Sequence, residues 1–182
     1  MPEIVGLNSE NAAHRVAVLW DEDGVEREGV FISRRDTSSH LNHLLGGRIF
    51  PGEHHQASFN VADSASEIRF DMKSADGEVS VEIEGNIVKD LPSSSIFSSL
   101  PEASSFFEGG SLGYSVTREP DRLDGLKLET KEWRVEPLQV SRVFSSYFSD
   151  EKNFPTGSID FDHALIMRNV AHEWHSADDL YV

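Results

Sequence analysis

The chain has 182 residues, a formal net charge of -16 and a pI near 4.7, and it contains no cysteine. This length suits a single domain, residues 1–182, built around one hydrophobic core. The acidity disfavours nucleic-acid and membrane partners, because their phosphates attract lysine and arginine, and the lack of cysteine excludes disulfides, thiolate metal sites and a cysteine nucleophile.

The absence of targeting and membrane signals points to the cytoplasm. No apolar run is long enough to span a bilayer, and the N-terminus lacks the basic and apolar regions of a signal peptide. The chain has only five lysines but 32 acidic residues. Such a surface stays soluble in concentrated salt and fits a salt-adapted host, with an acidic mesophilic protein as the alternative.

The first third of the chain predicts a hairpin, a short helix and a strand. Two β-rich runs, 15–20 and 29–33, flank the turn sequence at 21–24. Ser38 or Ser39 then caps a helix that ends at the glycine pair 46–47. From His54 the apolar residues alternate with period two, so one histidine of the pair His54 and His55 points inward.

The remaining chain adds more strands and two brief helices. Residues 68–72 and 79–83 form a second hairpin, and further strands are expected over 111–117, 126–130 and 138–148. A helix over 101–108 docks on the sheet through Ala103, Phe106 and Phe107, and Ser158 caps a last helix. Many short strands with two or three short helices predict a mainly β (α+β) fold, an antiparallel β-barrel or sandwich.

Five segments carry a family resemblance: residues 28–31, 34–39, 46–55, 109–118 and 133–137. They resemble the YqjF-like family of uncharacterised proteins, which is grouped by fold with acetoacetate decarboxylases, and the resemblance runs from about Val16 to His175. It implies a β-barrel of the acetoacetate-decarboxylase-like type. Members usually carry a further N-terminal portion, so the chain is expected to lack strands of its relatives unless its start is misassigned. A homodimer is one way to cover the resulting edge.

The resemblance does not carry over the decarboxylase mechanism. Acetoacetate decarboxylases form a Schiff base on a lysine of lowered pKa that follows a Gly-Arg turn. Here the turn Gly47-Arg48 leads to His54 and His55, and no lysine precedes Lys73. Schiff-base chemistry is therefore not expected at this place, although an imidazole can serve as a general acid or base.

The candidate catalytic residues are His54 and His55. Arg48 would bind a carboxylate or enolate beside the inner histidine, and Arg35 would add charge. The alternatives are that the inner histidine is a hydrogen-bonded core residue and its neighbour is solvated, and that Asp36 ties Arg35 in an ion pair.

Tyr114 and Arg118 are weaker ligand-binding candidates, with a structural role as the alternative. No metal site and no cofactor is predicted, since His172, Glu173 and His175 lack the zincin spacing and no phosphate-binding glycine loop or hydrolase elbow occurs. The sequence therefore predicts a pocket for a small anionic, oxo-acid-like molecule, with lyase-like acid/base chemistry left open. The alternative is a non-catalytic binding or oligomeric structural module.

Overall fold

The structure is a computed structural model that describes residues 9–40 and 52–181. Within these ranges the elements are β1 (Asn11–Glu22), β2 (Val25–Thr37), β3 (His54–Asp63), β4 (Glu67–Ser74), β5 (Ser80–Ile87), α2 (Leu100–Gly109), β6 (Leu112–Val116), β7 (Arg122–Thr130), β8 (Glu136–Ser145), β9 (Ala164–Ile166) and β10 (His172–Tyr181). The fold is mainly β, as the alternating runs predict, and the expected hairpins around residues 21–24 and 74–77 are both present.

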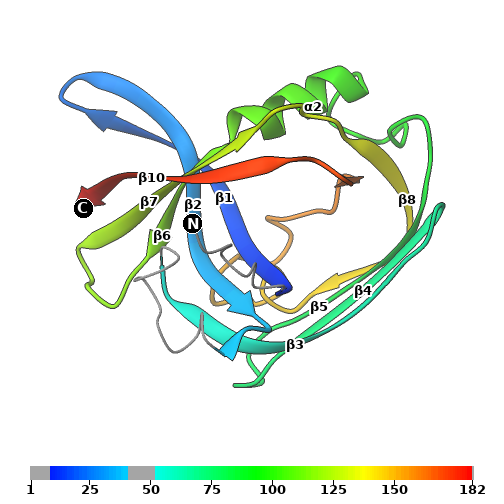
Figure 1. The fold of residues 1–182 in the computed structure, drawn as a ribbon, viewed down its shortest axis with the longest axis horizontal. Helices are drawn as coiled ribbons and strands as arrows, with labels where there is room; N and C mark the ends of the chain where they lie inside the picture. Colours follow the sequence, from blue (N-terminus) through cyan, green and yellow to red (C-terminus); the bar gives the residue numbers. More distant parts are fainter. Residues whose placement is uncertain (1–8, 41–51, 182) are drawn as a thin grey trace, which may run out of the picture.

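The described strands form one curled, mixed sheet in the order β10-β7-β6-β2-β3-β4-β5-β8-β9, with β1 paired to β2 (Figure 1). The prediction of a purely antiparallel sheet is wrong, because β2 runs parallel to both β3 and β6. Long connections precede β3 and β6, so the chain can return in the same direction. The end strands β9 and β10 are not paired with each other in the described ranges, so the sheet is not a closed barrel.

The C-terminal helix predicted at Ser158 does not form. The hydroxyl of Ser158 donates to the carbonyl oxygen of Pro155 at 2.6 Å, and residues 164–166 pair with β8 as β9. Pairing with the sheet overrides a local helical pattern. The helix predicted to end at residues 46–47 lies outside the described residues, so α2 is the only helix in the ranges 9–40 and 52–181. No helix described is long and apolar enough to cross a membrane.

Helix α2 begins as the sequence predicts and lies along one rim of the curled sheet (Figure 1). The Ser99 hydroxyl accepts a hydrogen bond from the backbone N–H of Glu102 at 3.4 Å, and a proline occupies the first turn. Ala103 is fully buried, but Phe106 and Phe107 remain 53% and 45% exposed. Only part of the apolar face of α2 is therefore docked on the sheet.

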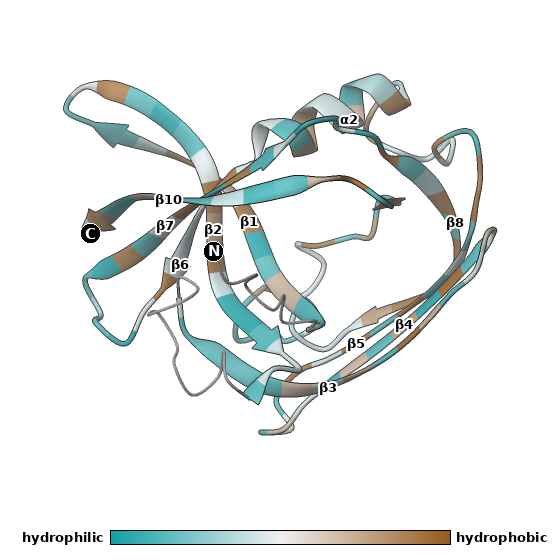
Figure 2. Cartoon of the chain, in the orientation of Figure 1, coloured by the Kyte–Doolittle hydropathy of each residue, from teal (hydrophilic) through white to brown (hydrophobic). Residues whose placement is uncertain are grey.

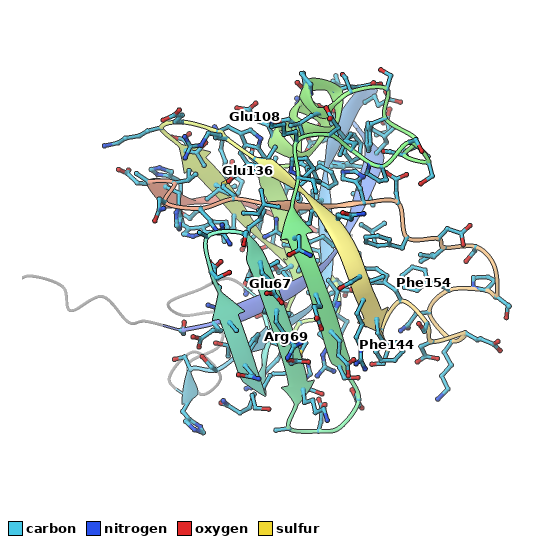
Figure 3. All side chains as sticks on the ribbon, turned by 90° about the vertical axis from the view of Figure 1, so that its right-hand side faces the viewer. Glu67, Arg69, Glu108, Glu136, Phe144 and Phe154 are labelled. Carbon is cyan, nitrogen blue, oxygen red and sulfur yellow. The ribbon has the colours of Figure 1, made fainter. Side chains whose placement is uncertain are left out.

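The buried apolar cluster lies on the inner face of the wall made by β3, β4 and β5. Ala57, Met72 and Val79 form it. The outer face of the same wall is charged, and Figure 3 shows Glu67 and Arg69 there on β4. Hydrophobic residues occur as short bands along the strands rather than as long runs (Figure 2). The core is consequently small, and polar side chains take part in filling the inside of the curl.

A substitution at Gly125 tests how closely β10 packs against β7. These two strands supply part of the wall of the site described below. A Cβ at Gly125 would overlap the carbonyl oxygen of Asp178 and lie 3.0 Å from that of Ala177. We expect Gly125→Ala to lower the free energy of unfolding by about 1–3 kcal/mol, measured by urea denaturation. Gly109→Ala, where a Cβ meets nothing within 4 Å, is the matched control and should lose no stability. Equal stability of the two variants would contradict this packing.

Candidate functional site

Strand alternation and a β-bulge sort the charged residues of β1 and β2 onto two faces. In this hairpin His14 lies opposite Arg34, whereas the next residue, Arg15, lies opposite Ile32, so the register shifts by one residue. Successive side chains of a strand point to opposite faces, so Arg34 and Arg35 diverge. Two polar sites result, one on each face.

The first site is an ionic network around Arg34. The guanidinium of Arg34 donates to Asp36 at 2.9 Å, to Asp76 at 2.8 Å and to Glu78 at 2.9 Å. The interpretation that Asp36 ties Arg35 is therefore wrong. Residues i and i+2 share a face of a strand, so the partner of Asp36 is Arg34.

Asp36 is the most buried member of this network, with 0% exposure. His14 Nε2 lies 3.5 Å from its Oδ2, and the His14 ring stacks on Tyr147. Burial raises the pKa of Asp36, but the hydrogen bonds and charges of His14 and Arg34 together outweigh burial and hold that pKa below its ordinary value. Because its charges are already paired, the network has the character of a structural element rather than a ligand site.

The second site is a hollow of about 380 Å³ on the Arg35 side of β2, which we name the arginine pocket. Its walls are Ser9, Asn11, Ala12, Ala13, Arg15, Arg35, His54, Leu126, His172 and Trp174. Strands β1, β2, β3, β7 and β10 thus each supply part of the wall of this hollow. None of these described wall residues is a carboxylate.

Arg15 and Arg35 bring two positive charges into the arginine pocket. Arg35 Nε donates to Ser115 Oγ at 2.9 Å, and neither arginine has a carboxylate partner among the residues described. Burial, and then the charge of Arg15, lower the pKa of Arg35 to about 10. Burial of the guanidinium also lowers the pKa of Arg15, although the residue as a whole is exposed to solvent. Both groups remain protonated at neutral pH, so the pocket is cationic.

His54 is the more buried histidine of the predicted pair, with 6% exposure, and it lies opposite Arg35 in the parallel ladder between β2 and β3. Its Nδ1 lies 3.2 Å from the carbonyl oxygen of Gly52. A carbonyl can only accept, so in the neutral ring Nδ1 carries the proton and Nε2 carries the lone pair. The arginine pocket thereby has an imidazole in its wall beside two guanidinium groups.

The structure brings together two of the sequence-predicted site residues, Arg35 and His54. His55 lies on the opposite face of β3, with its Nδ1 3.3 Å from Asp76 Oδ2 in the ionic network. Arg48 lies outside the described residues. The predicted pairing of a histidine with Arg48 therefore stays a prediction, and the predicted arginine that lines the same hollow as His54 is Arg35.

Tyr114 and Arg118 lie away from the arginine pocket. The Tyr114 ring meets Trp20 edge to face with centroids 5.4 Å apart. Arg118 is 77% exposed, with its Nε 3.8 Å from Glu53 Oε1, which is a surface ion pair. Neither residue lines the wall around Arg35.

Sequence reasoning missed Arg15, His172 and Trp174 as pocket residues. The signal for Arg15 is its place at the start of the apolar run 15–20, where a charge on a strand face needs a partner. The two residues of β10 had no comparable signal. Their alternation places His172 and Trp174 on one face only once the segment is known to be a strand.

The chain matches no protein-family model and no curated protein. The resemblance to the YqjF-like family thus stays a prediction. The arginine pocket is interpreted from its own geometry and charge.

The ionic network predicts a dependence of stability on acid. The pKa of Asp36 and that of Asp76 are lowered in the folded state, so both carboxylates stabilise the fold above their unfolded pKa of about 4 and lose this contribution as the pH falls. Asp36→Asn should lower the free energy of unfolding by about 3–5 kcal/mol at pH 7 and reduce its decline towards pH 3, measured by urea unfolding. Asp121→Asn, at an exposed turn, should match the wild type. Loss of stability in both variants alike would contradict the network.

Proposed function

We propose that the protein binds a small organic anion, of the oxo-acid or carboxylate class, in the arginine pocket. The observation that carries this proposal is the meeting of Arg15 and Arg35 on walls that contain no carboxylate within the described chain. Two like charges that repel each other destabilise the empty pocket, and an anion between them would remove the repulsion.

The composition makes this arrangement unusual. The chain has 32 acidic residues against 16 basic ones, so a carboxylate partner is abundant for any arginine. Seven other described arginines do have an acidic partner within 4.0 Å: Arg27, Arg34, Arg69, Arg118, Arg122, Arg142 and Arg168. The exposed Arg134 also lacks such a partner, but Arg15 and Arg35 combine this lack with a place in the wall of a hollow. An anionic ligand accounts for both features.

The size and donors of the pocket set the class of ligand. A volume of about 380 Å³ lies within the range of small-molecule sites and suits a molecule of a few carbon atoms in the charged region. Guanidinium groups bind carboxylates with two parallel hydrogen bonds, and Trp174 offers an apolar wall beside them. The resemblance to acetoacetate-decarboxylase-like proteins supports an oxo acid as the first ligand to test.

Removal of either pocket arginine should weaken anion binding. In isothermal titration with a panel of short oxo acids, such as pyruvate and acetoacetate, we expect Arg35→Met and Arg15→Gln each to weaken binding about 10- to 100-fold, as a hydrogen bond to a charged group is lost. Without ligand, Arg15→Gln should not lower the melting temperature, since it relieves repulsion. Arg134→Gln, an exposed arginine outside the pocket, is the control. Absence of binding heat with every acid would remove the proposal.

A second candidate function is proton transfer on the bound oxo acid. His54 favours it, because an imidazole in the wall of the arginine pocket can serve as a general base towards the carbon next to a carbonyl. Two nearby guanidinium groups would stabilise the enolate that forms. This chemistry needs no Schiff base, which agrees with the absence of lysine before Lys73.

Deuterium exchange tests the proton transfer directly. If His54 acts as a base, the methyl protons of pyruvate should exchange in deuterated buffer faster than without protein, and His54→Gln should slow this exchange by about 100-fold or more while the acid still binds. His40→Gln, at an exposed position, is the control. The measurement is proton NMR of the substrate. Exchange at the uncatalysed rate with the wild-type protein would leave binding as the function.

A further inference from the structure

A second, larger hollow lies next to the arginine pocket. It has a volume of about 660 Å³, lies between the β1–β2 hairpin and the second half of α2, and we name it the helix pocket. The side chains that matter for its chemistry are Arg15, Ala17, Leu19, Val30, Phe106 and Phe107. Apart from Arg15 and Glu28, its described wall residues are uncharged, and most are apolar or glycine.

The two hollows share one wall residue, Arg15. Arg15, Ala17 and Leu19 occupy alternate positions of β1 and therefore lie on one face in a row. A ligand that reaches Arg15 from the arginine pocket is thereby at the start of an apolar track that runs along β1 under α2.

The apolar side chains of this track are poorly covered. Leu19 is 65% exposed, Phe106 53% and Phe107 45%. Adjacent exposed apolar groups beside a concave surface mark a place where an apolar partner is bound. The shared arginine requires that this partner carry a negative charge at one end.

Another apolar hollow lacks this combination. The cavity of about 360 Å³ around Trp20, Phe31 and Tyr114 has no charged residue among its described walls. It can take an apolar group but cannot fix an anion. Of these two apolar hollows, only the helix pocket has an arginine among its described walls, and this residue, Arg15, also lines the arginine pocket.

We propose that the ligand is an amphipathic monoanion, a carboxylate with an unbranched apolar chain, whose head lies in the arginine pocket and whose chain lies in the helix pocket. The inference rests on the proposed anion binding and adds the substrate class. Glu28 fixes the direction, because it lies opposite Leu19 at the end of the track away from Arg15 and would repel the carboxylate. The head therefore lies at Arg15 and Arg35, and the chain points towards Glu28.

The test is a series of straight-chain carboxylates from butyrate to decanoate, each titrated below its micelle concentration by calorimetry. Each added methylene in a half-open apolar hollow should tighten binding about two- to fourfold until the track is filled. Ala17→Phe, at an exposed alanine of the track, should remove this dependence on chain length and keep the binding of butyrate. Leu19→Ser serves as a second variant should the larger side chain disturb folding.

The matched control is Ala65→Phe, an alanine to phenylalanine change at an exposed position remote from both pockets, which should behave as the wild type. Equal affinity for butyrate and decanoate would overturn the amphipathic ligand and leave anion binding intact. Chain-length dependence that survives both Ala17→Phe and Leu19→Ser would also overturn it, since the chain would then lie elsewhere. Failure of every carboxylate to bind would remove the proposed function itself, and with it this inference.

Discussion

The alternation of β2 through Arg34, Arg35 and Asp36 is the constraint on which the site depends. Three consecutive charges in one strand cannot share a face, so the first and third point to one side and the second to the other. On one face of β2, Arg34 binds carboxylates, whereas on the other face Arg35 binds Ser115 and lies near Arg15. The same stretch of backbone therefore supplies an arginine that is paired with carboxylates on one face and an arginine without a described carboxylate partner on the other.

The two faces support each other in energetic terms. Two guanidinium groups without acidic partners destabilise a fold, and burial, followed by the charge of Arg15, lowers the pKa of Arg35. On the opposite face Arg34 has three carboxylate partners, and Asp36 is fully buried between charged neighbours. This network holds β2 in one register, so the position of Arg35 does not relax away from Arg15. A binding group that is unfavourable without ligand has to be held in this way by its surroundings.

The sequence predicts the hairpins and α2 because their signals are local. Turn residues, period-two alternation, and the early proline and terminal glycines of α2 act within a few positions. It does not predict that β2 runs parallel to β3 and β6, since pairing between distant strands leaves no local trace. The helix predicted after Ser158 is wrong for the same reason, because residues 164–166 pair with the distant strand β8 and form β9. In the site, alternation indicates that a histidine faces inward, but identifying Arg15 as its neighbour requires the fold.

The open curl of the sheet explains why hollows exist in a chain with so small a core. A closed barrel of this size would fill its interior with side chains. Here β9 and β10 do not pair with each other in the described ranges, and α2 buries Ala103 while leaving Phe106 and Phe107 exposed. A hollow therefore remains on each side of Arg15. The arginine pocket, towards β3 and β10, has cationic walls, and the helix pocket, towards α2, has mostly apolar walls. A single arginine at this boundary can fix the charged end of a ligand and leave its other end in apolar surroundings.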